Sequence, residues 1–279
     1  MYNNDLARLL QQIEQNRHSV NQAFALADNQ VARQFEQIQT NLTKTLAPVW
    51  SGVSQLVETA NRIIRDAYPP NWPEGLRLDL EKLEQIAQVE GIPLFYVPRA
   101  EIVTALLDAS DFEARLAIVD QYTDEIGQDC RDAMRAPVHE PLQDRTILAN
   151  KAVEAFIAGH YESAQALAVV VCDSYLKTHV TGRYKEMRED LAINKSEEAA
   201  VWPTFRLLMP MATAVPFLAE WQPHKDAPAP STFSRHATIH GASTDQLNRL
   251  HATLAIMLLT TMTRALDAGI SRYGSINGT

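Results

Sequence analysis

The segment SRHATIHG, residues 234–241, concentrates the side chains of this sequence that could do chemistry. It places Arg235, His236 and His240 within six residues, in a chain that has eight histidines. An imidazole exchanges protons near neutral pH, and a guanidinium stabilises the charge that builds up on a phosphate during cleavage. A histidine and an arginine together are the minimum set for cleaving RNA without a metal ion.

The residues that follow the segment predict how its side chains are placed. Gly241 is expected to end a short helix or turn, and Ser243-x-x-Gln246 has the spacing of a capping box for the next helix. On a helix, His236 and His240 share a face, whereas Arg235 and His240 lie about 140° apart around the axis and about 7.5 Å apart along it. They could border one cleft without touching.

Two other interpretations of the same residues remain open. The His-x3-His pair could bind a metal ion, but no third ligand lies at a nearby spacing and no glutamate follows the first histidine, as it does in the helical zinc motif. We therefore expect neither a metal nor a cofactor. Alternatively, the cluster only caps and hydrogen-bonds the fold, because an arginine followed closely by a histidine also arises by chance.

Composition predicts an all-α protein with two regions. The chain has 279 residues, is 46% hydrophobic and holds only ten glycines, and the residues typical of a β-sheet form few and short clusters. A proline cluster, APVHEPLQD at 136–144, marks the best boundary. It divides an N-terminal helical region, 1–140, from a C-terminal helical bundle, 141–279.

Heptad-like apolar spacing over residues 6–63 predicts two helices, about 3–46 and 49–66, or one helix that kinks. This region either packs within its own domain or pairs with another chain. Further helices are expected at 78–89, 99–109 and 111–135, with Ser110 as the N-cap of the last, and IPLFYVP at 92–98 as an extended piece. Five acidic residues are expected to form a solvated helix face rather than a cation site: Asp120, Asp124, Glu125, Asp129 and Asp132.

The C-terminal region begins with an apolar helix pair. Two helices joined at AGHYES, 158–163, are expected to end and restart around Gly159. Asp173 falls in the apolar half of the second helix, where a buried carboxylate needs a partner or belongs to a site. A charged helix, RYKEMREDLAI, a proline-interrupted apolar helix, TFRLLMPMATAVPFLAEW, and an exposed loop at 222–232 should follow.

In this context SRHATIHG resembles the signature of the HEPN superfamily, whose members carry Arg-x4-6-His motifs, commonly close to NRHxxxHG. Arg235, His236, His240 and Gly241 match, and Ser234 departs from the pattern. The helix pair AFIAGHYESAQALAVVVCDSYL is similar to the early helices of that bundle, in which an acidic residue stands near the position of Asp173. The resemblance covers about residues 145–272, and the N-terminal half matches nothing with a known function.

The resemblance implies a homodimer in which two motifs line a cleft for RNA. His240 would transfer protons and Arg235 would stabilise the phosphate, with His236 and Asp173 as accessory residues. The protein would then be a metal-independent endoribonuclease of a toxin or abortive-infection type, active in anti-phage defence and paired with an antitoxin or a regulatory partner. The alternative is a non-catalytic helical scaffold, because several members of that superfamily have lost catalysis.

Charge and cysteine usage limit the cellular setting. The net charge of −9 argues against broad nucleic-acid affinity, although residues 215–279 carry five Lys or Arg against four Asp or Glu. Cys130 and Cys172 lie far apart, as expected for buried free thiols in a reducing compartment. No signal peptide is expected, and the apolar stretches 207–218 and 252–262 are shorter than a bilayer span. We therefore expect a cytoplasmic protein without a membrane partner.

Overall fold

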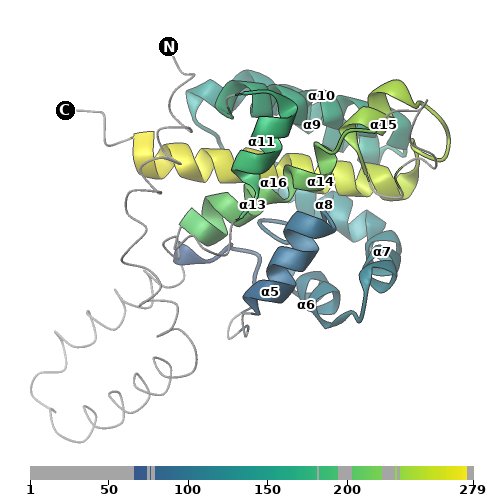
Figure 1. The fold of residues 1–279 in the computed structure, drawn as a ribbon, viewed down its shortest axis with the longest axis horizontal. Helices are drawn as coiled ribbons and strands as arrows, with labels where there is room; N and C mark the ends of the chain where they lie inside the picture. Colours follow the sequence, from purple (N-terminus) through teal and green to yellow (C-terminus); the bar gives the residue numbers. More distant parts are fainter. Residues whose placement is uncertain are drawn as a thin grey trace, which may run out of the picture.

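The computed structural model describes residues 66–73, 76, 79–180, 182–193, 203–221, 230 and 233–274, and every regular element in these ranges is helical. The protein is therefore all-α in its described part, as composition predicts (Figure 1). The elements, with η marking π- and 3-10 turns, are α5 (Leu80–Glu84), η2 (Gln85–Val89), α6 (Ala100–Asp108), α7 (Phe112–Gln121), α8 (Thr123–Met134), η3 (Glu140–Leu142), α9 (Gln143–Ile157), α10 (Tyr161–His179), α11 (Tyr184–Leu191), η4 (Thr204–Leu208), α13 (Met209–Ala212), α14 (Ala214–Phe217), α15 (Arg235–His240) and α16 (Arg249–Tyr273).

Helix α16 forms the centre of the fold. Its 25 residues run across the molecule with α9 and α10 on one side and α7 and α8 on the other (Figure 1). Its side chains are buried almost all round, including Ile256, Met257 and Leu259, none of which exposes any surface. A helix that is apolar on every face needs such a position, because only burial on all sides removes that surface from water.

The same helix is the one described element that is long and apolar enough to cross a membrane. It is longer than the apolar run 252–262 alone, but 83% of its most apolar window is buried inside the protein. Such burial is typical of a core helix. Cys130 and Cys172 are also buried and free, which confirms the expectation for both thiols.

The helix pair predicted after residue 145 is confirmed. Helices α9 and α10 pack closely against each other and are joined by a tight turn at Gly159, whose φ of +81° lies in the left-handed region. Arg145 fixes their alignment by donating hydrogen bonds to Ser174 (2.8 Å) and Thr178 (2.7 Å) across the pair. A hairpin of this kind buries one face on α16 and leaves the opposite face toward solvent.

The single helix predicted over 111–135 is wrong, because the chain divides into α7 and α8 at Tyr122. The hydroxyl of Thr123 donates to the carbonyls of Val119 (3.2 Å) and Asp120 (2.9 Å), and such back-bonding competes with regular helical bonding. The predicted cap is also displaced by one residue. Asp111 caps α7 by accepting from Ala114 N, while Ser110 donates to Asp111.

Packing crosses the boundary predicted at 140/141. Gly127 of α8 lies so close to α9 that a Cβ atom there would come within 2.9 Å of the Phe156 ring. Helix α8 also contacts α16, and one hydrophobic cluster runs from Leu83 to Leu266. The division into two regions stays a prediction, and the helices expected at 3–46 and 49–66 with their heptads, like most of the loop 222–232, lie outside the described residues.

Candidate functional site

The SRHATIHG segment forms α15, the short helix predicted from Gly241. Ser234, the residue that departs from the superfamily pattern, is its N-cap: the hydroxyl accepts from Ala237 N at 3.4 Å. The amide of Gly241 closes the helix on the carbonyl of Ala237 at 2.8 Å. The residue types of this segment are therefore those that start and stop one and a half turns of helix.

Gly241 is required by space rather than by backbone conformation. Its φ of −121° is open to any residue, but a Cβ atom there would lie 2.6 Å from the Trp221 ring. The glycine lets the indole pack directly against the end of α15, which fixes the helix against the segment that follows α14. This close approach is a tertiary reason for the glycine and was not predictable from its helix-stopping role.

Helix α15 is also held in place by the buried side-chain amide of Gln165 on α10. Gln165, on α10 and without exposed surface, donates to the hydroxyl of Thr238 (3.0 Å) and to the carbonyl of Gln246 (2.8 Å). The same carbonyl lies 3.0 Å from Nδ1 of His251. One glutamine thus ties α10 to both α15 and the turn that leads into α16.

Arg235 points inward from α15 toward α10 and α11. Only 9% of the residue is exposed, and its guanidinium carbon lies 3.7 Å from the centre of the Tyr184 ring, in van der Waals contact with the ring face. The nearest carboxylate oxygen, from Asp173, is 3.8 Å from Nη1, beyond hydrogen-bonding distance. Within the described part of the chain, its buried Nε has no hydrogen-bond partner.

Asp173 is held by other groups than Arg235. The hydroxyl of Tyr184 donates to one of its oxygens at 2.8 Å, and the ammonium of Lys177 lies 2.6 Å from the other. This carboxylate therefore has the partner that its position on an apolar helix demands. Hydrogen bonding of the Lys177 ammonium to Asp173, which is the largest cause, and to Tyr184 raises the pKa of Lys177.

The two histidines of the motif form a second cluster on the other side of α15. Their rings meet edge to face with centres 4.7 Å apart, which confirms the shared face predicted from the spacing. His240 is exposed, whereas His236 is partly buried and its Nδ1 has no partner within the described residues. Burial lowers the pKa of His236, and the nearby charges of His240 and Arg235 lower it further.

The four predicted site residues thus fall into two pairs. Arg235 lies beside Asp173, and His236 lies beside His240. No hydrogen bond or ion pair joins Arg235 to His240 within the described ranges, in line with their predicted angular separation. The two pairs are adjacent because Arg235 and His236 are consecutive in the chain.

Sequence reasoning missed Tyr184, Gln165 and Lys177. Tyr184 opens a helix that reads as charged and solvated, and only the turn at Gly182, with φ +112°, brings its ring over Arg235. A signal did exist for Lys177, which follows Asp173 at the i, i+4 spacing of a helical ion pair. Gln165 offered none, because one polar residue in an apolar helix does not reveal its partner.

The helix after the motif begins later than the capping-box spacing predicts. Ser243 and Gln246 form a turn, in which Gln246 N donates to the Ser243 hydroxyl at 3.3 Å. Asn248 is the actual N-cap and accepts from His251 N at 2.9 Å, so α16 starts at Arg249. The Ser243–Gln246 spacing therefore forms a turn, and Asn248, which was not predicted as a cap, caps α16.

The acidic face of α7 and α8 is partly neutralised by arginines, as a surface role predicts. Asp129 accepts from Nε and Nη2 of Arg99, and Asp120 accepts from Arg249 at 2.8 Å. Within the described part of the chain, no three His, Cys, Asp or Glu side chains gather closely enough to hold a metal ion.

Four of the large hydrophobic residues that remain exposed among the described ones lie on α9, α10 and α15, and α10 packs against the other two helices. The four are Ile147, Leu148, Val170 and Ile239. Single exposed apolar residues are common on protein surfaces, and of these four only Ile239 belongs to α15 itself.

The comparisons with known proteins add no relative: no family model, no curated protein and no solved structure matches this chain.

Proposed function

We propose that this protein is a metal-independent endoribonuclease of the HEPN type that acts as a cytoplasmic homodimer in a toxin or abortive-infection role. The proposal rests on the motif, on the helix pair that resembles the superfamily and on the local geometry of α15. In this assignment His240 exchanges a proton with the 2′-hydroxyl or the leaving oxygen of RNA. Arg235 stabilises the phosphate, and His236 and Asp173 support these two groups.

The state of Arg235 is the observation that carries the proposal. A buried guanidinium is normally hydrogen-bonded, yet Asp173 stands 3.8 Å away with its two oxygens occupied by Tyr184 and Lys177. The Tyr184 ring supports the charge from one face without using any N–H group. Among the described residues, the buried Nε of Arg235 has no hydrogen-bond partner, so in this proposal the guanidinium binds a phosphate oxygen that reaches this largely buried side chain.

The histidine pair supports the same chemistry. The centres of the two rings lie 4.7 Å apart, so a charge on one ring disfavours a charge on the other. Burial, together with the charges of His240 and Arg235, lowers the pKa of His236 and favours its neutral form. His240 is exposed to solvent and is therefore the ring that substrate can reach, so in this proposal it exchanges the proton.

The homodimer is part of this proposal. In this proposal the second copy packs on exposed apolar residues of α10 and α15, such as Val170 and Ile239, and brings a second motif close to the first. The net charge of −9 limits general RNA affinity, so the RNA would be selected by shape or delivered by a regulatory partner.

The direct test is RNA cleavage in the presence of a chelator. We expect the wild type to cleave a structured RNA pool, and His240→Ala to lose at least about 100-fold in rate, the lower end of what a general acid or base contributes. His160→Ala, which changes an exposed histidine before α10, should cleave like the wild type. Equal rates in all three proteins would indicate a contaminating nuclease and end the proposal.

A scaffold function is the second candidate, and one observation favours it. Arg235 is buried under Tyr184, a position that also suits a structural cation holding α11 against α10 and α15. If the wild type cleaves no RNA while Arg235→Lys lowers the thermal midpoint by several degrees, the scaffold becomes the better assignment.

A further inference from the structure

A pocket of about 590 Å³ lies at the C-terminal end of α16, away from α15. Its walls come from the last turns of α16, the end of α8, η4 and the irregular segment around Tyr96. A volume of this size is typical of small-molecule sites in proteins. Charged and small apolar side chains alternate around it: Asp66, Pro70, Tyr96, Asp132, Ala133, Ala136, Arg206, Arg264, Asp267, Ala268, Ser271 and Arg272.

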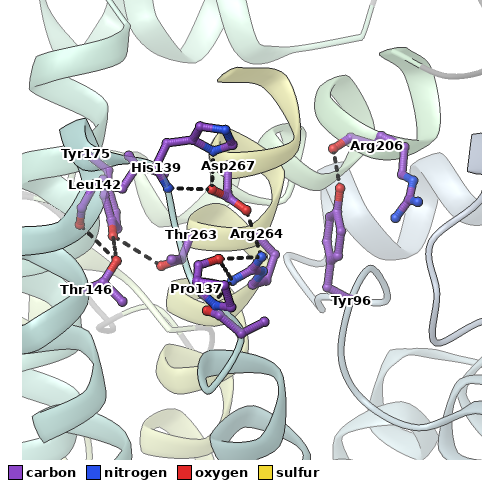
Figure 2. A network of polar contacts seen from close by, with 11 residues as sticks. Tyr96, Pro137, His139, Leu142, Thr146, Tyr175, Arg206, Thr263, Arg264 and Asp267 are labelled. Carbon is purple, nitrogen blue, oxygen red and sulfur yellow. Dashed lines mark hydrogen bonds and ion pairs between the residues drawn. The ribbon is translucent and has the colours of Figure 1, made fainter. Parts of the chain in front are cut away.

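One wall of the pocket is held by hydrogen bonds that link Arg264 and Asp267 of α16 to the segment that follows α8 (Figure 2). Arg264 donates to the carbonyl of Ala136 at 3.0 Å and to the carboxylate of Asp267 at 2.7 Å. The other oxygen of Asp267 accepts from the backbone amide of His139 at 2.9 Å and lies 2.7 Å from its Nδ1. Arg264 and Asp267 thus satisfy each other, and neither offers a free charge to a ligand.

The opposite wall contains the guanidinium group of Arg206. Figure 2 shows Arg206 next to Tyr96, apart from the Arg264 network. The Tyr96 hydroxyl donates to the Arg206 carbonyl at 2.7 Å, and the guanidinium carbon lies 5.7 Å from the ring centre. Arg206 Nε donates to the carbonyl of Asp66 at 2.9 Å. The charge of Arg206 also acts on the Tyr96 hydroxyl, and among the described residues no carboxylate forms an ion pair with Arg206. Its charge therefore has no carboxylate partner in that part of the chain.

The charges around the pocket limit the charge of that ligand. Three arginines and three aspartates line it, so their formal charges cancel. Asp267 is bound to Arg264, and Asp132 is 2.9 Å from Arg135 outside the pocket. Because Arg264 is already paired with Asp267 and Asp66 adds a negative charge to the lining, the second charge of a doubly charged anion on Arg206 would be poorly offset. A singly charged, planar carboxylate matches the guanidinium fork and avoids that cost.

We propose that this pocket binds a small organic monocarboxylate, with its carboxylate on Arg206 and an apolar body along Ala133, Ala136 and Ala268. Tyr96 supports the arginine from the side, and the Arg264–Asp267 network keeps the opposite wall in place. This site is separate from the α15 motif, and its occupancy does not depend on whether the protein cleaves RNA.

Calorimetric titration of the full-length protein with three compounds of one shape tests the proposal. They are 2-naphthoate, the neutral 2-naphthamide and the doubly charged 2-naphthyl phosphate. We expect 2-naphthoate to bind at least tenfold more tightly than either of the others. A tighter phosphate, an equal amide or no binding of the carboxylate at millimolar concentration would overturn the assignment.

Variants locate the binding. Arg206→Gln should weaken 2-naphthoate binding at least tenfold, whereas Arg188→Gln, which removes an exposed arginine from α11, should change it less than twofold. Ala268→Leu narrows the pocket while leaving every arginine, and should weaken binding at least fivefold. Thermal midpoints of the three variants within a few degrees of the wild type confirm that they fold. Unchanged affinity in both Arg206→Gln and Ala268→Leu would place the ligand elsewhere.

Discussion

The guanidinium of Arg235 rests on the ring of Tyr184 at 3.7 Å, and the hydroxyl of the same ring donates to Asp173 at 2.8 Å. Tyr184 therefore contacts Arg235 with its ring and Asp173 with its hydroxyl group. The ring face stabilises the cation, and the hydroxyl takes up the carboxylate oxygen that would otherwise hydrogen-bond the arginine. This arrangement connects α10, α11 and α15 at the candidate site.

Substituting Tyr184 should separate these two contributions. Tyr184→Phe keeps the ring and removes the hydroxyl, so we expect a loss of about 1 kcal/mol in the free energy of unfolding. Tyr184→Ala also removes the cation–π contact and the packed ring, and should cost at least about 1 kcal/mol more. Urea unfolding measures both. A loss in Tyr184→Phe as large as in Tyr184→Ala would assign the whole effect to the hydroxyl.

Stability should fall on the acid side because of His236. Its pKa in the folded protein lies below the ordinary value of 6.5, so the unfolded chain takes up a proton first as the pH falls. The free energy of unfolding then decreases from about pH 6.5 downward and levels off once the folded protein is protonated too. His236→Gln should reduce this loss between pH 7.5 and 5. Parallel curves for both proteins would show that other groups cause the dependence.

Breaking the buried ion pair between Glu90 and Arg115 should be costly. Both side chains are less than a tenth exposed, and two hydrogen bonds of 2.7 Å join them. Glu90→Gln leaves the arginine charge buried without its partner and should lower the free energy of unfolding by about 3–5 kcal/mol. Glu189→Gln is the matched control, because Glu189 pairs with Lys185 at 4.0 Å on the exposed surface and should cost at most about 1 kcal/mol.

Adding a single methyl group at Gly241 should disturb the end of α15. The new Cβ atom would meet the Trp221 ring at 2.6 Å, and relieving that overlap should cost about 1–3 kcal/mol. Gly274→Ala, where the nearest atom lies 3.4 Å from the new Cβ, provides the comparison and should be nearly neutral. Tryptophan fluorescence reports whether the indole moves. An unchanged spectrum and midpoint in Gly241→Ala would mean that α15 is not held by this contact.

The sequence predicted the elements that local rules determine. The helix pair around Gly159, the short helix closed at Gly241 and the shared face of His236 and His240 follow from glycine and helical spacing. Errors arose where two local signals competed. Ser110 and Asp111 could both cap α7, and Ser243 and Asn248 could both precede α16; in each case the later residue is the cap.

The surroundings of the candidate site were not predictable, because they depend on contacts between distant segments. Nothing near Arg235 in the sequence indicates that Tyr184 will cover it or that Trp221 will reach Gly241. The pocket at Arg206 is a further case, since its lining comes from segments spread along the chain between Asp66 and Arg272. The residue types indicated which chemical groups the protein has, and tertiary packing determined which of those groups lie together in one site.

The central position of α16 has a consequence for communication between its two ends. The helix starts just after the turn that follows α15, and its Asp267 lies about 27 Å further along the axis, beside the pocket. At physiological salt the Debye length is about 8 Å, so a charge bound at Arg206 has little electrostatic influence on His240. An effect of ligand binding at Arg206 on the α15 motif would therefore require α16 to move. Because α16 is buried and closely packed, we expect it to move as a rigid unit.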